Sequence, residues 1–207
     1  MKPVAKLALG AIAVAATLLP ASAGGEASLH FGRRWLEEST WAPVEEPRLA
    51  GVSVDFGREA WPVRLEAAYS VSYRREDDTF PRYGNGVIDT RIAELSFGVL
   101  KRWRIGGPVG LRLGGGAVSF IEAVDVDGHG PWGRQHDTDT SPGAYAHAGL
   151  DFRLGSRVSA GFDVRKVFWT SFTKLEDHYV AYKRMFEGDA DYFQVTLLAG
   201  WRWPQDG

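Results

Sequence analysis

Hydrophobic and polar residues alternate one for one over residues 144–169, with a single interruption at Gly155-Ser156-Arg157. A period of two over this length predicts two antiparallel β-strands joined by a tight turn. Up to residue 164 one face of the hairpin is wholly apolar. The other face carries four charges: Asp151, Arg153, Asp163 and Arg165. The two faces therefore require different surroundings.

Strand-like patterns recur along the whole chain. They lie at residues 28–36, 49–56, 63–73, 91–100, 109–121, 144–154, 158–169 and 192–203, which predicts an all-β protein. In the first segment Arg33 falls among the apolar positions, and a β-bulge at Gly32 would restore the alternation.

The links between these segments alternate in length. Residues 57–62, 101–108 and 155–157 form short links, whereas residues 37–48, 74–90, 124–142 and 170–191 form long ones. In an up-and-down arrangement every short link lies at one end of the strands and every long link at the other. This asymmetry is typical of the periplasmic turns and extracellular loops of outer-membrane barrels.

The N-terminus has the pattern of a secretory signal. Lys2 and Lys6 precede or begin an apolar run that extends to Leu19, and Ala21-Ser22-Ala23 provides a cleavage site. We expect a signal peptide over residues 1–23 and one β-barrel domain over residues 24–207. The chain has no cysteine, so its closure depends on hydrogen bonding and packing rather than on disulfides.

Three architectures compete for these strands. A β-sandwich needs Greek-key crossovers, which nothing in the sequence indicates. A soluble periplasmic ligand-binding barrel would hold the apolar face inside. Small residues on that face, and aromatic residues near strand ends such as Tyr73, Trp103 and Trp201, favour lipid outside instead. The sequence thus predicts an eight-stranded antiparallel up-and-down transmembrane β-barrel, with the soluble barrel as the alternative.

The transmembrane barrel places the polar face of each strand in the lumen and the apolar face in lipid. The charged residues expected in the lumen are Arg34, Asp55, Arg64, Glu66, Glu94, Arg102, Arg112, Asp151, Arg153, Asp163, Arg165 and Arg202. Unpaired charges in a narrow lumen are costly, so we expect a structural network of salt bridges that closes it; a basic pore is the alternative. The residues expected to face lipid include Leu150, Phe152, Phe162, Val164, Val195 and Leu197.

No motif for enzymatic chemistry accompanies this pattern. His30 and His147 share the polar face, but neither GxSxG nor His-x-Ser is present, so we expect no catalytic residue, metal or cofactor. The link over residues 124–142 has part of a calcium-loop pattern without its third ligand or terminal glutamate, and a solvated loop is the favoured interpretation. A net charge of −4 after cleavage gives no reason to expect nucleic acid.

The segments GLDFRLGSRVSAGFDVRKV and YFQVTLLAGWRW resemble the small outer-membrane β-barrel proteins of the OmpA-like and OmpW-like family. The resemblance covers essentially the chain after cleavage, and lies in the strand pattern rather than in a catalytic signature. It implies a Gram-negative outer membrane, its lipid, and assembly by the barrel-insertion machinery. Two alternatives follow from it: a narrow channel for small apolar molecules, and a lipid-modifying enzyme.

The charge distribution suggests where the protein meets other molecules. The four long links carry a formal charge of −9 and the three short links +4. Aromatic residues, including Trp41, Phe80, Trp132 and Tyr179, accompany the acidic ones. In an outer-membrane barrel the long links face the exterior. We therefore expect a structural or surface-interaction role, with a surface ligand or host molecule as a partner at these loops.

Overall fold

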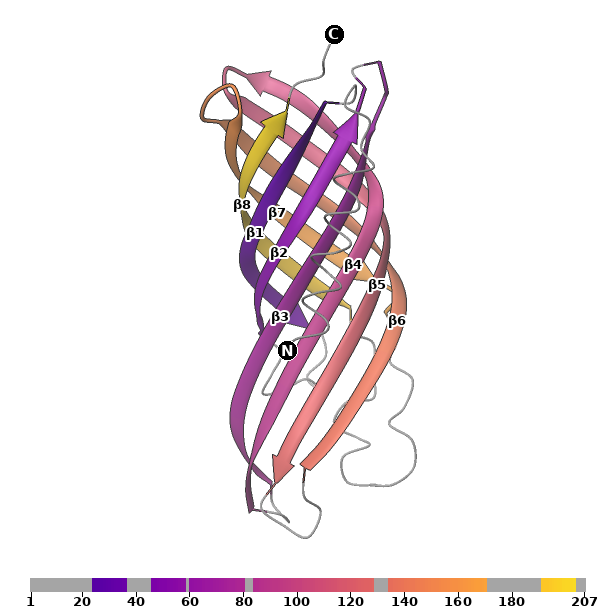
Figure 1. Cartoon of the computed structure of the whole chain (residues 1–207), viewed down its shortest axis with the longest axis vertical. Coiled ribbons are helices and arrows are strands. Elements are labelled where there is room, and N and C mark those ends of the chain that lie inside the picture. Colours follow the sequence, from indigo (N-terminus) through magenta and orange to yellow (C-terminus); the bar gives the residue numbers. More distant parts are fainter. Residues whose placement is uncertain are drawn as a thin grey trace.

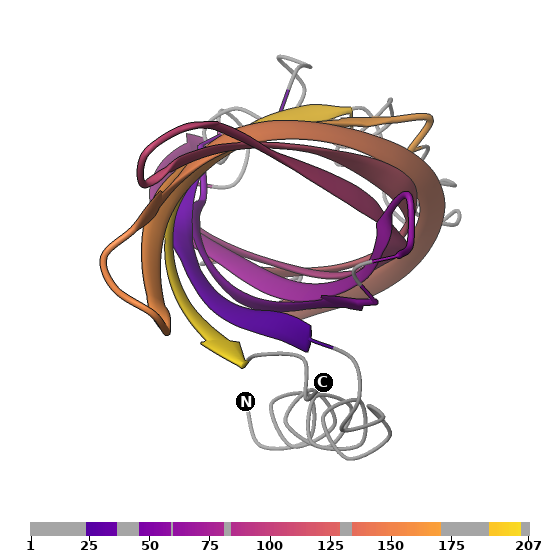
Figure 2. The same ribbon diagram turned by 90° about the horizontal axis from the view of Figure 1, so that it is seen from above.

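Eight strands form one closed antiparallel barrel (Figure 1, Figure 2). The structure, a computed structural model, describes residues 24–36, 46–58, 60–80, 84–128, 134–170 and 191–203. Each strand pairs with its neighbours along the chain, and the last pairs with the first. The strands are β1 (Gly24–Leu36), β2 (Arg48–Gly57), β3 (Arg64–Phe80), β4 (Gly84–Gly106), β5 (Val109–Gly128), β6 (Arg134–Arg153), β7 (Val158–Phe168) and β8 (Tyr192–Trp203). The predicted fold class is confirmed, whereas the predicted signal peptide lies outside the described residues.

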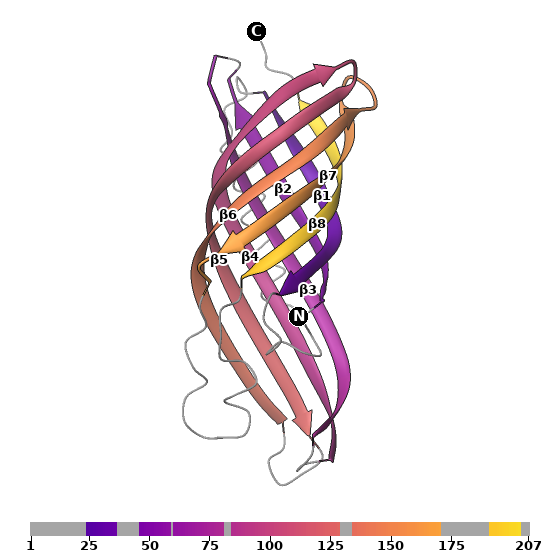
Figure 3. The ribbon, with the colours of Figure 1, turned by 180° about the vertical axis from the view of Figure 1, so that it is seen from behind.

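Four strands are much longer than the pattern predicts. β3 to β6 have 17 to 23 residues, whereas β1, β2, β7 and β8 have 10 to 13. Their extra length extends past the ends of the other strands, opposite the short turns (Figure 1, Figure 3). The prediction of loops over residues 74–90 and 124–142 is therefore wrong for most of both segments. The apolar alternation fades there, but the ladder continues through backbone pairs such as Arg75 with Asp89 and Asp125 with His136.

The bulge at Gly32 that would have restored the alternation of β1 does not occur. The register of β1 is continuous against both neighbours, with Arg33 opposite Arg48 on one side and Val195 on the other. Arg33 therefore points outward, and its side chain lies 3.7 Å from Glu46, with both largely exposed. A charged residue breaks the apolar pattern here because the position lies near the end of the barrel wall.

The two faces of the barrel wall differ sharply. Polar and charged side chains point inward on every strand and are buried, as Arg165 and Asp163 are on β7. Large apolar side chains alternate with them and point outward: Phe162 remains 39% exposed, and Leu197 on the adjacent strand 67%. No helix among the described residues is long and apolar enough to cross a membrane. This barrel has its ionic groups inside, with some apolar side chains such as Phe120 and Ile92 among them, and exposes large apolar side chains on its outer face, the reverse of a soluble barrel.

Exposed aromatic residues lie at both ends of the apolar surface. Trp61, Trp103 and Trp201 lie near the short turns, whereas Tyr73 and Trp169 lie toward the long hairpins. Aromatic girdles of this kind flank the apolar band of membrane barrels at the two lipid–water interfaces. The belt between them is the surface that must meet an apolar solvent.

Candidate functional site: an ionic lumen and its basic mouth

One cluster of the lumen centres on Glu94 of β4, whose side chain is 2% exposed. Arg34 donates to its carboxylate at 2.7 Å, and Arg165 lies 2.8 Å from the other oxygen. The hydroxyl of Tyr192 donates to the same carboxylate. Arg34 also donates to Ser72 at 3.1 Å, and its guanidinium stacks over the Tyr192 ring at 4.2 Å. The cluster thus joins strands β1, β3, β4, β7 and β8 across the interior.

A second cluster surrounds His147 of β6. Its Nδ1 lies 2.8 Å from Asp163 and its Nε2 3.4 Å from Glu66. Arg112 lies within 3.8 Å of Glu66 and 3.7 Å of Asp163. Gly114 provides the space for the imidazole, since a Cβ at this position would collide with the ring. The cluster places two carboxylates around a guanidinium and an imidazole, so its charges balance when the imidazole is protonated.

A third cluster lies at the short-turn end and centres on Glu26 of β1. Arg102 donates to Glu26 at 2.5 Å, and Arg202 donates to the same oxygen at 2.6 Å. Arg102 also donates to Asp55 at 2.6 Å, and Asp55 accepts a further bond of 2.5 Å from Arg64. Charge-assisted bonds of this length are among the stronger interactions in proteins. They join the ends of β1, β2, β3, β4 and β8.

The structure brings seven of the eight principal predicted lumen residues into these clusters. They are Arg64, Glu66, Glu94, Arg112, Asp151, Asp163 and Arg165. Arg153 is different: it is exposed and has no carboxylate partner among the described residues, because it is the last residue of β6 and lies at the rim. The charges of the β6–β7 hairpin also pair mainly with other strands rather than with each other, as Asp151 does with Arg202.

Two members of the network were missed by sequence reasoning. Glu26 lies before the predicted start of its strand, although extending the alternation of β1 by two residues would have placed it inside. Tyr192 was treated as the boundary of the last strand, and only its fully buried position in the closed barrel shows that it belongs to the Glu94 cluster.

The six residues predicted to face lipid all lie on the outer face. Phe152, Phe162 and Leu197 are exposed. Leu150, Val164 and Val195 are half-buried beside them, because neighbouring side chains on the curved wall partly cover them. Contact with acyl chains stays a prediction for all six.

The two candidate histidines have different partners, and the Nε2 of His30 lies 2.7 Å from the Ser53 hydroxyl. The His147 ring is held between two carboxylates, and within the described part of the chain no hydroxyl or thiol nucleophile is hydrogen-bonded to it. No group of three or more potential metal-ligating side chains occurs within the ranges that the structure describes. The candidate divalent site over residues 124–142 falls largely on residues whose side chains lie outside the described part.

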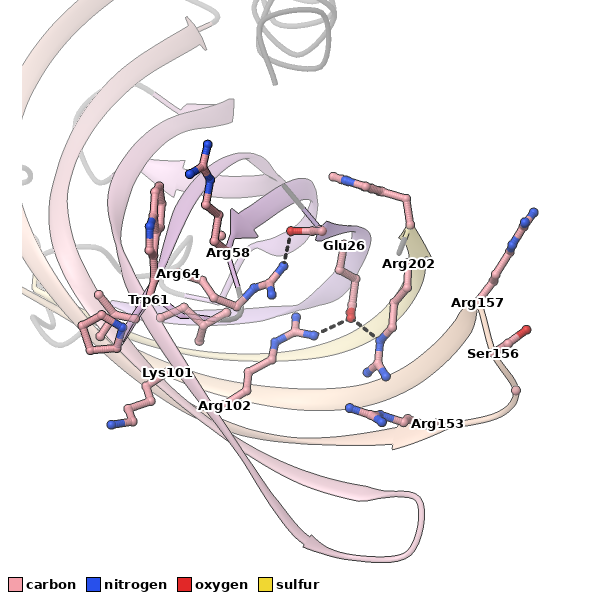
Figure 4. A pocket seen from close by; sticks show the side chains of 18 residues that line it. Glu26, Arg58, Trp61, Arg64, Lys101, Arg102, Arg153, Ser156, Arg157 and Arg202 are labelled. Atoms are coloured by element: carbon pink, nitrogen blue, oxygen red, sulfur yellow. Dashed lines mark hydrogen bonds and ion pairs between the residues drawn. The ribbon is translucent and has the colours of Figure 1, made fainter. Parts of the chain in front are cut away.

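A cavity of about 760 Å³ lies at the short-turn end, above the Glu26 cluster (Figure 4). Side chains from the turns and from the last residues of the strands line it. The charged ones are Arg58, Arg64, Lys101, Arg102, Arg153, Arg157 and Arg202, with Glu26 as the acidic residue among them. We call this cavity the basic mouth.

No protein-family model matches the chain, and no curated protein matches its sequence. Solved structures do match. The fold is that of the small outer-membrane β-barrels. A major outer membrane protein from Thermus thermophilus is similar with a TM-score of 0.64 and 12% identity, covering 87% of this chain and 99% of that chain.

Two further outer-membrane barrels give the same result. Ail, the attachment invasion locus protein of Yersinia pestis, was solved in complex with the heparin analogue sucrose octasulfate. It matches with a TM-score of 0.57 and 14% identity, covering 88% of this chain and 99% of that chain. Neisserial surface protein A matches with a TM-score of 0.51 and 12% identity, covering 87% and 96% of the two chains. The predicted resemblance to small outer-membrane barrels is thereby confirmed.

Proposed function

We propose that the protein is a non-enzymatic integral protein of a bacterial outer membrane, exported through a signal peptide cleaved after Ala23. Its role is structural or is exercised at the cell surface through the long hairpins, and its lumen is closed by the salt-bridge network. The observation that carries this proposal is the reversed polarity of the barrel wall, with ions inside and large apolar side chains outside.

The outer surface is suited to lipid rather than to water. Exposed apolar side chains are spread around the barrel, and include Leu29 on β1, Val71 on β3, Phe97 on β4 and Leu113 on β5. A continuous apolar belt of this kind on a soluble monomer would promote aggregation. In hydrocarbon the same belt is favourable, and closure of the barrel satisfies every strand edge.

The side chains in the lumen favour a closed barrel over a channel that conducts ions. Arginines join carboxylates from different strands within each of the Glu94, His147 and Glu26 clusters, and Arg34 and Arg112 are at most 2% exposed. Eight strands enclose only enough space for side chains or one small ligand. Ions that are already paired inside such a space exclude a continuous column of water.

The long hairpins support a surface role. β3 continues for seven residues beyond Tyr73, which pairs with the first residue of β2, and β6 begins ten residues before Ala144, which pairs with the last residue of β7. These extensions correspond to roughly 25–35 Å of extended strand. A sheet extended in this way forms a platform beyond the barrel wall. Its links are acidic, which favours a cationic ligand, or an anionic one bridged by divalent cations. Ail was solved with a sulfated ligand, whereas the acidic links of this chain favour the opposite charge.

Fractionation tests the membrane assignment first. We expect the protein in the outer-membrane fraction, with gel migration that shifts on heating because the folded barrel resists detergent. Recovery in the soluble periplasm would contradict the proposal and restore the ligand-binding barrel. Lipid mass spectrometry of cells with and without the protein tests the enzymatic alternative, and we expect identical lipid profiles.

Planar-bilayer recording tests the closed lumen. We expect little or no steady single-channel conductance from the purified barrel, because the buried ion pairs occupy the interior. Large, steady conductance would contradict closure and favour the narrow channel.

A deletion strain separates the structural role from the surface role. Complementation with a barrel whose β3–β4 and β5–β6 hairpins are shortened should restore membrane integrity if the barrel itself is what the cell requires. If integrity returns but attachment to a surface ligand does not, the hairpins carry the interaction. If the deletion strain keeps both membrane integrity and attachment, both proposed roles are contradicted.

A further inference from the structure

The basic mouth has a strong excess of positive charge at the end opposite the acidic links. Seven basic side chains and one acidic side chain line a cavity of about 760 Å³. This volume lies within the range of pockets that bind small molecules. In Figure 4 the side chains of Arg102 and Arg202 converge on Glu26, and Arg153 extends toward them from the end of β6, whereas Arg157 points away.

The inner part of this lining is already compensated. Arg64, Arg102 and Arg202 pair with Glu26 and Asp55, and Arg202 also lies 3.4 Å from Asp151. Three carboxylates therefore balance three guanidinium groups at the floor of the mouth. These pairs fix the floor, but contribute no net charge that could attract a ligand.

The outer part is not compensated. Arg58, Lys101, Arg153 and Arg157 line the cavity, and none has an ion pair with a carboxylate among the described residues. Two of these cations are directed to the outer surface: the Lys101 ammonium lies 5.5 Å from the centroid of the Trp103 ring, and the Arg157 guanidinium lies 5.8 Å from that of Trp201. Arg58 and Arg153 are therefore the cations that remain at the cavity without anions of their own.

The floor also retains an unused donor. The Nε of Arg102 is buried and has no hydrogen-bond partner in the described part of the chain, although both of its terminal nitrogens are bonded. A buried donor without a partner is unfavourable unless something else accepts from it. An anion or a water in the mouth would supply that acceptor.

We propose that the basic mouth is a binding site for a soluble anion that carries more than one phosphate group. Guanidinium groups match phosphate oxygens in a bidentate geometry, and the guanidinium groups of Arg58 and Arg153 together with the unpartnered Nε of Arg102 offer donors to several phosphate oxygens. The cavity lies within the ring formed by the strand ends, whereas the headgroups of surrounding lipids lie outside the wall. A soluble anion therefore fits this position better than a lipid headgroup. This inference does not depend on the function of the long hairpins at the opposite end.

Titration calorimetry with inorganic tripolyphosphate tests the site on the purified full-length barrel in a maltoside detergent, which contains no phosphate. We expect saturable binding with one site per barrel, and weakening by added salt because the attraction is ionic. The variant Arg58→Gln/Arg153→Gln should bind about tenfold more weakly, since it removes two uncompensated charges. Both positions are exposed, so heat-modifiable migration should show that the variant remains folded.

The matched control is Arg33→Gln/Arg48→Gln, which removes two exposed charges from the opposite end of the barrel. It should leave tripolyphosphate affinity unchanged. Equal weakening in both variants, or binding that does not saturate, would overturn the proposal because the anion would then respond only to net charge.

Nanodiscs distinguish the source of the phosphate. The affinity for tripolyphosphate should be the same in phosphatidylcholine nanodiscs with and without phosphatidylglycerol. Competition by phosphatidylglycerol would overturn the assignment to a soluble anion, because an anionic headgroup would then occupy the mouth.

Discussion

Replacing Glu94 by glutamine is the sharpest test of the ionic lumen. The substitution keeps the shape of the side chain but removes the charge that Arg34 and Arg165 share at 2.7 and 2.8 Å. At an effective dielectric constant of about 20, each close pair contributes roughly 4 kcal/mol of Coulomb attraction, which the cost of dehydrating the carboxylate partly offsets. Breaking a buried pair from one side typically costs about 3–5 kcal/mol. We expect Glu94→Gln to lower the free energy of unfolding by this amount.

Equilibrium unfolding by urea in detergent micelles or lipid vesicles provides the measurement, with tryptophan fluorescence as the signal. Glu46→Gln is the matched control, because Glu46 pairs with Arg33 at 3.7 Å while both side chains remain about half exposed. The control should change the unfolding free energy by less than about 1 kcal/mol.

A compensating variant distinguishes charge from packing. Arg34→Met added to Glu94→Gln restores the net charge of the cluster, since one cation and one anion have been removed together. The double variant should therefore be more stable than Glu94→Gln alone. If Glu94→Gln is as stable as the unmodified protein, or if Arg34→Met makes it less stable still, the account of the lumen as a charge-balanced network is refuted.

Three further predictions concern the outer wall, the hairpins and the N-terminus. Phe162→Arg should destabilise the assembled barrel by about 2–4 kcal/mol if this residue lies near the bilayer midplane, whereas Phe162→Leu should have a small effect. If both variants refold equally well in vesicles, the position does not face lipid. Replacing residues 76–88 by Asn-Gly, to join Arg75 and Asp89 by a two-residue turn, should preserve heat-modifiable migration, because the removed pairs lie beyond the barrel wall. Failure of that variant to fold in detergent would show that the barrel needs the extension. N-terminal sequencing of exported protein should begin at Gly24, and a start at any other residue would contradict cleavage after Ala23.

Strand pairing in the barrel was largely predictable because it depends on local alternation. A side-chain period of two determines which residues share a face, and this alone places Leu150 and Phe152 on the face opposite to Asp151. The alternation of short and long links then predicted neighbour-to-neighbour pairing, which the closed order of β1 to β8 confirms. The ends of β3 to β6 were not predictable in the same way. Beyond the apolar belt nothing requires alternating side chains, and backbone hydrogen bonds alone extend the ladder.

The partners in the lumen depended on tertiary structure. The sequence indicates that Arg34, Glu94 and Arg165 point to the same side of their strands, but residues 34 and 165 are far apart along the chain. Only closure of the sheet brings these side chains to one carboxylate. In the β6–β7 hairpin Asp163 has a local partner, His147 at 2.8 Å, whereas Arg165 pairs with Glu94 of β4. Asp151 of the same hairpin pairs with Arg202 of β8.

The sequence by itself determined that this chain forms eight strands with one apolar and one charged face, since that information is periodic and local. The tertiary structure decided which charges meet, because salt bridges across a lumen join residues from different strands. It also decided which charged side chains have no ion-pair partner. At the short-turn end three carboxylates are used by three inner arginines, and Arg153 remains at the rim with Arg58 beside an open cavity. Counting charges along the sequence cannot distinguish the paired arginines from the unpaired ones. Whether a charge is neutralised depends on its distance from opposite charges and on which groups share the same enclosed space.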